Sequence, residues 1–329
     1  MKGTFTISLD FELHWGGFEK WPLENYRQYF LNTRKTIPEM LSLFTQYEVH
    51  VTWASVGILF HQTRQELMDN IPASKPTYKI KELSAYNFIE KNGIGNDEQE
   101  DPFHFAPHLI RKIALTDGQE LGSHTFAHYY CNEEGQTPDQ FREDLRAAQR
   151  VASNYRMSLR SLVFPRNQFN DQYLKVCFEE GITSVRSNPL DWFWHIESTQ
   201  DESMWKRINR GADAYFPIGM KNTYPLSSLK VREGLPLCIP ASRLLRPYQP
   251  NEFFLNDFKI NRIKSEMTRA AKKGEVYHLW WHPHNFGDFP EQSLEGLDSI
   301  LKHYRECHDQ YGMQSLNMGE ISTIVRNEN

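Results

Sequence analysis

The sequence predicts an α/β fold in which about seven parallel strands form a distorted barrel covered by helices. Strand-like and helical patterns alternate along nearly the whole chain, which is typical of parallel sheets with helical crossovers. Polar clusters follow several predicted strands, and in α/β barrels functional groups gather at the carboxyl ends of strands. The 329 residues therefore fit a single elaborated domain, 1–329, with insertions at about 59–105 and 188–256.

The first elements form a strand, helix, strand unit. Residues 4–9 alternate apolar side chains with Thr and Ser, which predicts a strand that ends at Asp10. Residues 32–47 carry apolar side chains at helical spacing, and 49–54 read as a second strand. Asp10 is therefore expected at the carboxyl end of the first strand.

The same rhythm continues to the C-terminus. Further strands are predicted at 119–122, 161–164, 182–186 and 276–281, and further helices at 109–115, 137–153, 171–180, 258–273 and 294–310, with a short element from Met318. The polar first insertion contains a run of turn and acidic residues, which suits a lid or rim. The second insertion is rich in prolines and aromatic residues and is predicted to be irregular.

Composition excludes several classes of protein. The net charge of −5 and the absence of a dense Lys/Arg run argue against nucleic acid as a partner. No window reaches the roughly 18 to 20 apolar residues of a membrane span, and residues 1–10 lack a secretion-signal pattern. The four cysteines are far apart and form no Cys-x-x-Cys pair, so we expect reduced thiols and a cytoplasmic location. The sequence makes no prediction about oligomeric state.

The first polar cluster is Asp10, Glu12 and His14 in the segment SLDFELHWG. In an extended chain these three side chains point to the same side. A row of polar groups facing water is the alternative. However, so apolar a strand should be buried, where unpaired carboxylates are unfavourable, and this favours a functional role.

His124 and His128 form the second cluster, in ELGSHTFAHYYC. Their spacing of four places both imidazoles on one face of a helical turn. Catalytic zinc commonly takes two histidines and one carboxylate and keeps a position open for water. Many His-x-x-x-His pairs are simply solvated or satisfied within the core, so the pair gains meaning only together with the strand-end carboxylates.

Two further clusters follow later strands. Arg166 and Asn167 could hold a carboxylate by bidentate hydrogen bonding and present backbone N–H groups to an oxyanion; a surface salt bridge is the alternative. His282 leaves a strongly apolar strand, and a histidine with a pKa near 6.5 can protonate a leaving amine. The alternative for His282 is a neutral core histidine bonded to backbone.

In this order, the clusters resemble the five motifs of the NodB-homology polysaccharide deacetylases, carbohydrate esterase family 4, over Thr4 to Ile321. GSHTFAH looks like the family's metal-binding motif, which implies that His124 and His128 are metal ligands. SLDFE resembles the first motif, which implies that Asp10 is the catalytic base. Phe11 occupies the place of the family's adjacent second aspartate, so Glu12 becomes the third metal ligand by analogy.

The resemblance also implies roles for later residues. FPRNQ is similar to the third motif, with Arg166 holding the base, and Asp191 falls in the fourth, where it would orient the acid or brace the arginine. His282 resembles the general acid of the fifth motif. Substrate contacts are expected from residues near the rim: Trp15, Asn167, Trp192 and His284, with Trp194 and Trp281 as further aromatic candidates for stacking on sugars.

The implied function is a metal-dependent hydrolase, with zinc as the expected metal, that removes an N-acetyl, formyl or O-acetyl group from a sugar. In this mechanism Asp10 takes a proton from water, His282 protonates the departing nitrogen, and the cation together with a backbone N–H after Arg166 stabilises the oxyanion. A cytoplasmic location favours a nucleotide- or lipid-linked sugar of surface polysaccharide or glycan biosynthesis.

Three alternatives remain open from the sequence. A metal-independent, allantoinase-like amide hydrolase of the same fold is favoured if Glu12 cannot reach a metal. A glycoside hydrolase with a related barrel would use two carboxylates, such as Asp10 and Asp191. A sugar-binding module without catalysis would need neither Asp10 nor His282 for its activity.

Overall fold

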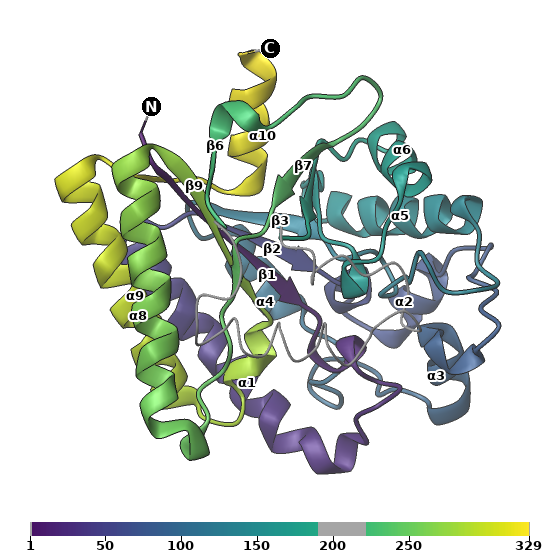
Figure 1. The fold of residues 1–329 in the computed structure, drawn as a ribbon. Helices are drawn as coiled ribbons and strands as arrows, with labels where there is room; N and C mark the ends of the chain where they lie inside the picture. The colour runs from purple at the N-terminus through teal and green to yellow at the C-terminus, as the bar shows by residue number, and fades with distance from the viewer. Residues whose placement is uncertain (1, 190–221, 329) are drawn as a thin grey trace.

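The computed structural model describes residues 2–189 and 222–328, and its centre is a curved sheet that forms a half-barrel (Figure 1). Seven neighbouring strands of this sheet run parallel, as predicted. In spatial order they are β9 (Glu275–Trp281), β1 (Thr4–Phe11), β2 (Val51–Ser55), β3 (Gln119–Ser123), β4 (Ser161–Leu162), β5 (Ser184–Ser187) and β7 (Leu237–Pro240). The predicted fold class is confirmed.

Strand β7 lies within the segment 188–256, which the sequence analysis treated as an irregular insertion. Its four residues pair in parallel with β5, and Leu237 and Ile239 are fully buried. The prediction was wrong for this part of the segment because four residues that end in a proline are too few to show a clear alternation. Three two-residue strands complete the described sheet: β6 (Tyr224–Pro225) and β8 (Arg243–Leu244), both on β9, and β10 (Gln314–Ser315) on β1.

The helices agree with the predicted pattern, although several begin earlier. The described ones are α1 (Leu23–Gln46), α2 (Arg64–Asn70), α3 (Ala85–Asn92), α4 (Pro107–Ala114), α5 (Pro138–Ser153), α6 (Asp171–Glu179), α8 (Phe253–Lys273), α9 (Pro290–Tyr311) and α10 (Met318–Asn327). Helix α5 starts with a capping box between Thr137 and Gln140 and has Pro138 at its first position, as its sequence suggests. Helices α2 and α3 belong to the predicted first insertion.

Helices α1, α8 and α9 pack together beside β1 and β9, whereas α5 and α6 pack beside the other end of the sheet (Figure 1). Every residue of β1 is buried, including Thr4, Thr6 and Ser8. The Ser8 hydroxyl contacts His278 and Arg186, so this face of β1 is polar but enclosed. Asp10 follows Ser8 at a spacing of two and lies on the same face.

Contacts between the end of β7 and β9 close the concave side of the half-barrel. The Ser242 N–H donates to the carbonyl of His278 at 2.8 Å, and the His278 ring bonds the Pro240 carbonyl at 3.1 Å. These contacts connect the end of β7 to β9 across the half-barrel. The carboxyl ends of β1, β3, β5 and β9 therefore surround one small polar region. Over the described part of the chain, none of the helices has the length and apolar character needed to cross a membrane.

Candidate metal and catalytic site

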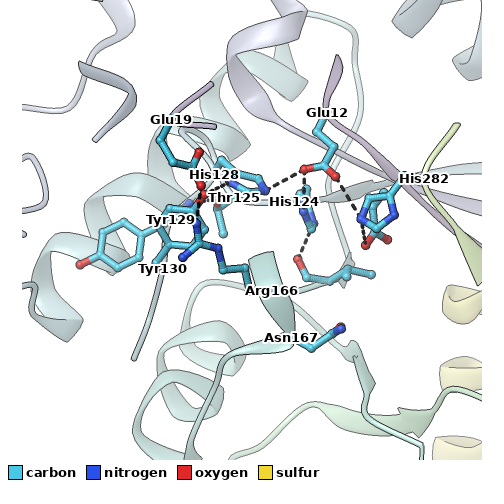
Figure 2. Close-up of polar contacts among 12 residues, drawn as sticks. Glu12, Glu19, His124, Thr125, His128, Tyr129, Tyr130, Arg166, Asn167 and His282 are labelled. Carbon is cyan, nitrogen blue, oxygen red and sulfur yellow. Dashed lines mark hydrogen bonds and ion pairs between the residues drawn. The ribbon is translucent and has the colours of Figure 1, made fainter. Parts of the chain in front are cut away.

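Glu12, His124, His128 and His282 meet at the carboxyl ends of β1, β3 and β9 (Figure 2). The Glu12 Oε2 atom lies 2.8 Å from Nε2 of His128 and 3.7 Å from Nε2 of His124. The other carboxylate oxygen, Oε1, lies 3.2 Å from Nε2 of His282. Glu12, His124 and His128 are almost fully buried, whereas the His282 side chain is 28% exposed and opens the cluster to solvent.

The position of Glu12 depends on the turn that follows β1. The strand ends at Phe11, Glu12 precedes a short 3₁₀ turn at Leu13–Gly16, and its carboxylate folds back over Gly16. A Cβ atom on Gly16 would lie 2.2 Å from Glu12 Oε2, so only glycine leaves room for the carboxylate in this place. The absent side chain of Gly16 is thus part of how Glu12 is oriented.

His14 does not share the direction of Asp10 and Glu12, and this expectation was wrong. The chain stops being extended at Glu12, and Leu13 adopts a left-handed conformation with φ of 47°. The His14 ring therefore turns away and bonds His104 and the Trp21 carbonyl, each at 2.8 Å. Burial lowers the pKa of His14 to about 4, so this histidine is neutral and structural.

The segment between His124 and His128 brings the two imidazoles together, with ring centroids 5.1 Å apart. It is a strained loop and not the helical turn that the spacing suggested, because Thr125 and His128 have φ of 64° and 54°. The buried carboxylate of Asp144 in α5 accepts N–H groups from Phe126 at 2.6 Å and Ala127 at 3.2 Å. Asp144 is thereby a positioning residue for both histidines.

The hydrogen bonds of these histidines leave nitrogen lone pairs for a cation. A carbonyl oxygen can only accept, so the 2.9 Å contact of His124 Nδ1 with the Val163 carbonyl places the proton on Nδ1. Nδ1 of His128 pairs with the Tyr130 hydroxyl at 3.0 Å. Burial lowers the pKa of His124 to about 4 and that of His128 to about 3, so both rings are neutral at physiological pH.

This donor set fits a divalent cation. The protonless Nε2 of His124 faces a carboxylate oxygen in a buried position, and two acceptors so placed are unfavourable unless a cation lies between them. One ligand atom from each of Glu12, His124 and His128 lies within 4.8 Å of the others. Two imidazoles and one carboxylate match the ligand preference of catalytic zinc, and the Val163 carbonyl supplies the supporting hydrogen bond typical of such sites.

Asp10 is held by Arg186, a residue that the sequence analysis did not identify. The guanidinium donates two hydrogen bonds to the Asp10 carboxylate, at 2.6 and 2.8 Å, and both side chains are buried. Arg186 also donates to the side chain of Asn167 at 3.1 Å and lies over the Trp280 ring. Burial raises the pKa of Asp10, but Arg186 more than offsets this, and the pKa stays well below its ordinary value.

Arg166 does not hold Asp10, and this expectation was wrong. Its guanidinium pairs with Glu19 and stacks over Tyr130 at 4.1 Å (Figure 2). Arg166 and Asn167 both have left-handed backbone conformations, which direct Arg166 away from Asp10. The Asn167 N–H donates to the Phe164 carbonyl at 2.8 Å within this turn, so the backbone N–H after Arg166 is already engaged and is not presented to an oxyanion.

His282 lies beside both carboxylates, with its Nε2 atom 3.6 Å from Asp10 Oδ2. His284 is buried behind it, and the two rings are stacked with centroids 4.9 Å apart. Burial lowers the pKa of His284 to about 3. His284 is only 4% exposed, so little of its ring is accessible for the expected contact with substrate.

Two of the tryptophans expected to stack on sugars belong to the core. Trp15 and Trp281 are completely buried; Trp15 packs on Phe18 and His104, and Trp281 stacks on Phe286. Their large apolar surface explains this burial better than ligand binding does. Asp191, Trp192 and Trp194 lie outside the described residues.

One family model matches part of the chain. Residues 28–185, just under half of the 329 residues, match the model of the polysaccharide deacetylase family. The matched region contains His124 and His128, begins after Glu12 and ends before His282. No curated protein sequence matches this chain.

Solved structures share the fold. A structure assigned as a polysaccharide deacetylase from Mycobacterium smegmatis has a TM-score of 0.59 at 14% identity, over 100% of this chain and 92% of its own. One from Pseudomonas aeruginosa PAO1, similarly assigned, has a TM-score of 0.59 at 12% identity, over 99% and 91%. An allantoinase has a TM-score of 0.55 at 11% identity, over 97% and 89%.

Over residues 28–185 the chain is similar to the polysaccharide deacetylase family, and these solved structures share its fold.

Arg186, Tyr130 and Asp144 were missed from the sequence, although one of them carried a signal. Arg186 is a charged residue at the end of a predicted apolar strand, the same feature that drew attention to Asp10. Tyr130 and Asp144 act through His128 and a backbone loop, and no local pattern distinguishes them from ordinary core and helix residues.

Proposed function

We propose that this protein is a divalent-metal-dependent deacetylase that removes an N-acetyl group from an amino sugar. The observation that carries the proposal is the convergence of Glu12 with His124 and His128, in which the Nε2 lone pair of His124 faces a carboxylate oxygen. These three residues would hold the cation. When bound there, a divalent cation polarises the amide carbonyl and lowers the pKa of water.

In the proposed reaction, Asp10 accepts the proton of the attacking water. Its carboxylate is ionised throughout the neutral range because Arg186 holds its pKa low, and the two hydrogen bonds from Arg186 fix its orientation. His282 donates a proton to the departing sugar nitrogen. Its Nε2 atom lies beside the carboxylates of Asp10 and Glu12. The products are acetate and a free amine.

Water and substrate would approach from the side of His282, because the other members of the cluster are buried. Asn167 is only partly buried and bonds Arg186, so it lies at the same entrance. We propose zinc as the cation and, as the substrate, an amino-sugar intermediate of surface polysaccharide or glycan biosynthesis carried on a nucleotide or lipid. N-formyl and O-acetyl groups are the other candidate leaving groups. We also propose a cytoplasmic location.

The test combines metal content with product analysis. Purified protein is assayed for acetate and formate release from nucleotide-linked, lipid-linked and free oligosaccharide amino sugars, before and after chelation and after zinc is restored. We expect acetate release that is lost on chelation and regained with zinc. Asp10→Asn and His282→Gln should lower kcat by at least about 10²-fold, as for other acid–base groups.

Other outcomes would identify the alternatives. Full activity in protein shown to contain no metal would support the metal-independent amide hydrolase and overturn the proposal. Release of reducing sugar without acetate or formate would indicate a glycoside hydrolase. Sugar binding that Asp10→Asn leaves intact, with no product released by the unmodified protein, would indicate a binding module.

A further inference from the structure

The two oxygens of Glu12 face different sets of histidines. Oε2 is directed at His128 and His124, whereas Oε1 lies 3.2 Å from Nε2 of His282. Behind His282 lies His284, stacked on it at 4.9 Å and 27°. One ligand atom from each of Glu12, His282 and His284 lies within 4.8 Å of the others. A second possible ligand group thus shares Glu12 with the first.

Packing alone does not explain why a histidine occupies position 284. Its ring lies among aromatic side chains, with Trp21, Tyr29 and Phe30 at 5.3 to 6.3 Å, and it is 4% exposed. Its Nδ1 atom is buried and has no hydrogen-bond partner among the described residues. A buried imidazole nitrogen without a partner is unfavourable by about 1 to 3 kcal/mol, so a phenylalanine would pack here at lower free energy. The unpartnered Nδ1 atom of His284 therefore indicates a ligand.

We propose that Glu12, His282 and His284 form a second divalent-cation site, weaker than the first and bridged to it by Glu12. The inference rests on the proposed function for the position of the first site. Three ligands around tetrahedral zinc are about 3.4 Å apart, so the side chains would have to approach by about 1 Å. The partly exposed side chain of His282 can make this adjustment.

Charge explains why the second site is the weaker one. Asp10 and Glu12 contribute two negative charges to the cluster, and Arg186 one positive charge. A first divalent cation brings the sum to +1, and a second would bring it to +3. Carboxylate-bridged pairs of cations are known at separations of about 3.5 to 4 Å. Here the other nearby carboxylate, Asp10, already accepts hydrogen bonds from Arg186 at both oxygens.

Occupation of the second site would inhibit the enzyme. The Nε2 atom of His282 cannot both bind a cation and carry the proton that the leaving nitrogen needs. Deacetylation should therefore rise as the first site fills and fall again at higher cation concentration. The affinity for the inhibitory cation should equal the affinity of the weaker site measured directly.

The experiment measures zinc bound per chain by equilibrium dialysis, together with acetate release over the same range of zinc concentration. We expect a first zinc bound tightly and a second bound at least about 100-fold more weakly. His284→Phe, which keeps an aromatic ring among Trp21, Tyr29 and Phe30, should retain the tight zinc and lose the weak one together with the inhibition. His284→Gln serves the same purpose if the phenylalanine variant does not fold.

Two further variants separate the possible failures. His128→Gln should abolish tight binding, and if it does not, the first site and the proposed function are wrong. His50→Gln removes a half-buried histidine that pairs with Glu320 at 2.8 Å away from the cluster, and it should leave both zinc affinities unchanged. A single zinc per chain at millimolar zinc, or a weak zinc that persists in both His284 variants, would overturn the second site.

Discussion

Gly16→Ala tests whether Glu12 is the carboxylate ligand. The new Cβ would lie 2.2 Å from Oε2 and 2.4 Å from Cδ of Glu12, whereas ordinary contacts begin near 3.4 Å. The carboxylate must therefore move by about 1 Å, which is several times the roughly 0.2 Å tolerance of a metal ligand. We expect zinc affinity to fall at least about 10- to 100-fold, or about 1.4 to 2.7 kcal/mol.

Protein stability should change little in this variant. Gly16 does not have a left-handed φ, and the displaced atoms are the end of a flexible side chain. The free energy of unfolding of the metal-free protein should stay within about 1 kcal/mol of the original value. Zinc affinity is measured by competition with a chelator, and unfolding with denaturant.

Gly296→Ala, in α9, is the matched control. Its Cβ atom would lie 3.4 Å from the Ile260 side chain, which is an ordinary van der Waals contact. It should leave zinc affinity unchanged. If Gly16→Ala binds zinc as tightly as Gly296→Ala does, Glu12 is not a ligand in the described position, and the assignment must be abandoned.

Three further predictions concern the groups around the site. Arg186→Met breaks a buried ion pair and should lower stability by about 3 to 5 kcal/mol and, because it releases Asp10, lower kcat of the folded enzyme by tenfold or more. Arg243→Met breaks a partly buried pair whose Glu266 also pairs with Arg262, so it should lower stability by less and leave kcat unchanged. Asp144→Asn replaces one accepting oxygen with an amide nitrogen, so the free energy of unfolding should fall by about 1 to 3 kcal/mol in denaturant titrations. Equilibrium dialysis should also show a lower zinc affinity, and an unchanged affinity would contradict the positioning role. Burial lowers the pKa of His278 to about 3, so protons bind the unfolded chain first, and stability of the metal-free protein should fall as pH drops from about 6.5 towards 3. The contribution of His278 alone is up to about 1.4 kcal/mol per pH unit, and His278→Gln should reduce the measured slope by that amount.

The sequence predicted the fold because its strands and helices are long, regular and arranged in one repeating order. β1, β9 and the helices around them were found within a few residues of their observed bounds, apart from the early starts of α1 and α8. β7 was missed because four residues carry too little pattern. The division into one domain with two insertions stays a prediction.

The site was predicted in part for the same reason. Asp10, Glu12, His124, His128 and His282 lie at or just beyond strand ends, and the topology of the sheet brings such ends together. Their chemical roles remain the proposals made above.

Arg166 was predicted to hold Asp10 because FPRNQ resembles the family's third motif, whereas Arg186 lies within β5 and was not identified. The decisive factor is the pair of left-handed residues at 166 and 167, which no periodicity reveals.

Asp10 and Glu12 are two residues apart, yet they differ in how the protein constrains them. Asp10 is part of β1, pairs with Ala54 of β2 and is held by Arg186, whereas Glu12 follows the last paired residue and depends on a short turn. Under the proposed function, substitutions in that turn would change the cation affinity while Asp10, the proposed base, stays in place.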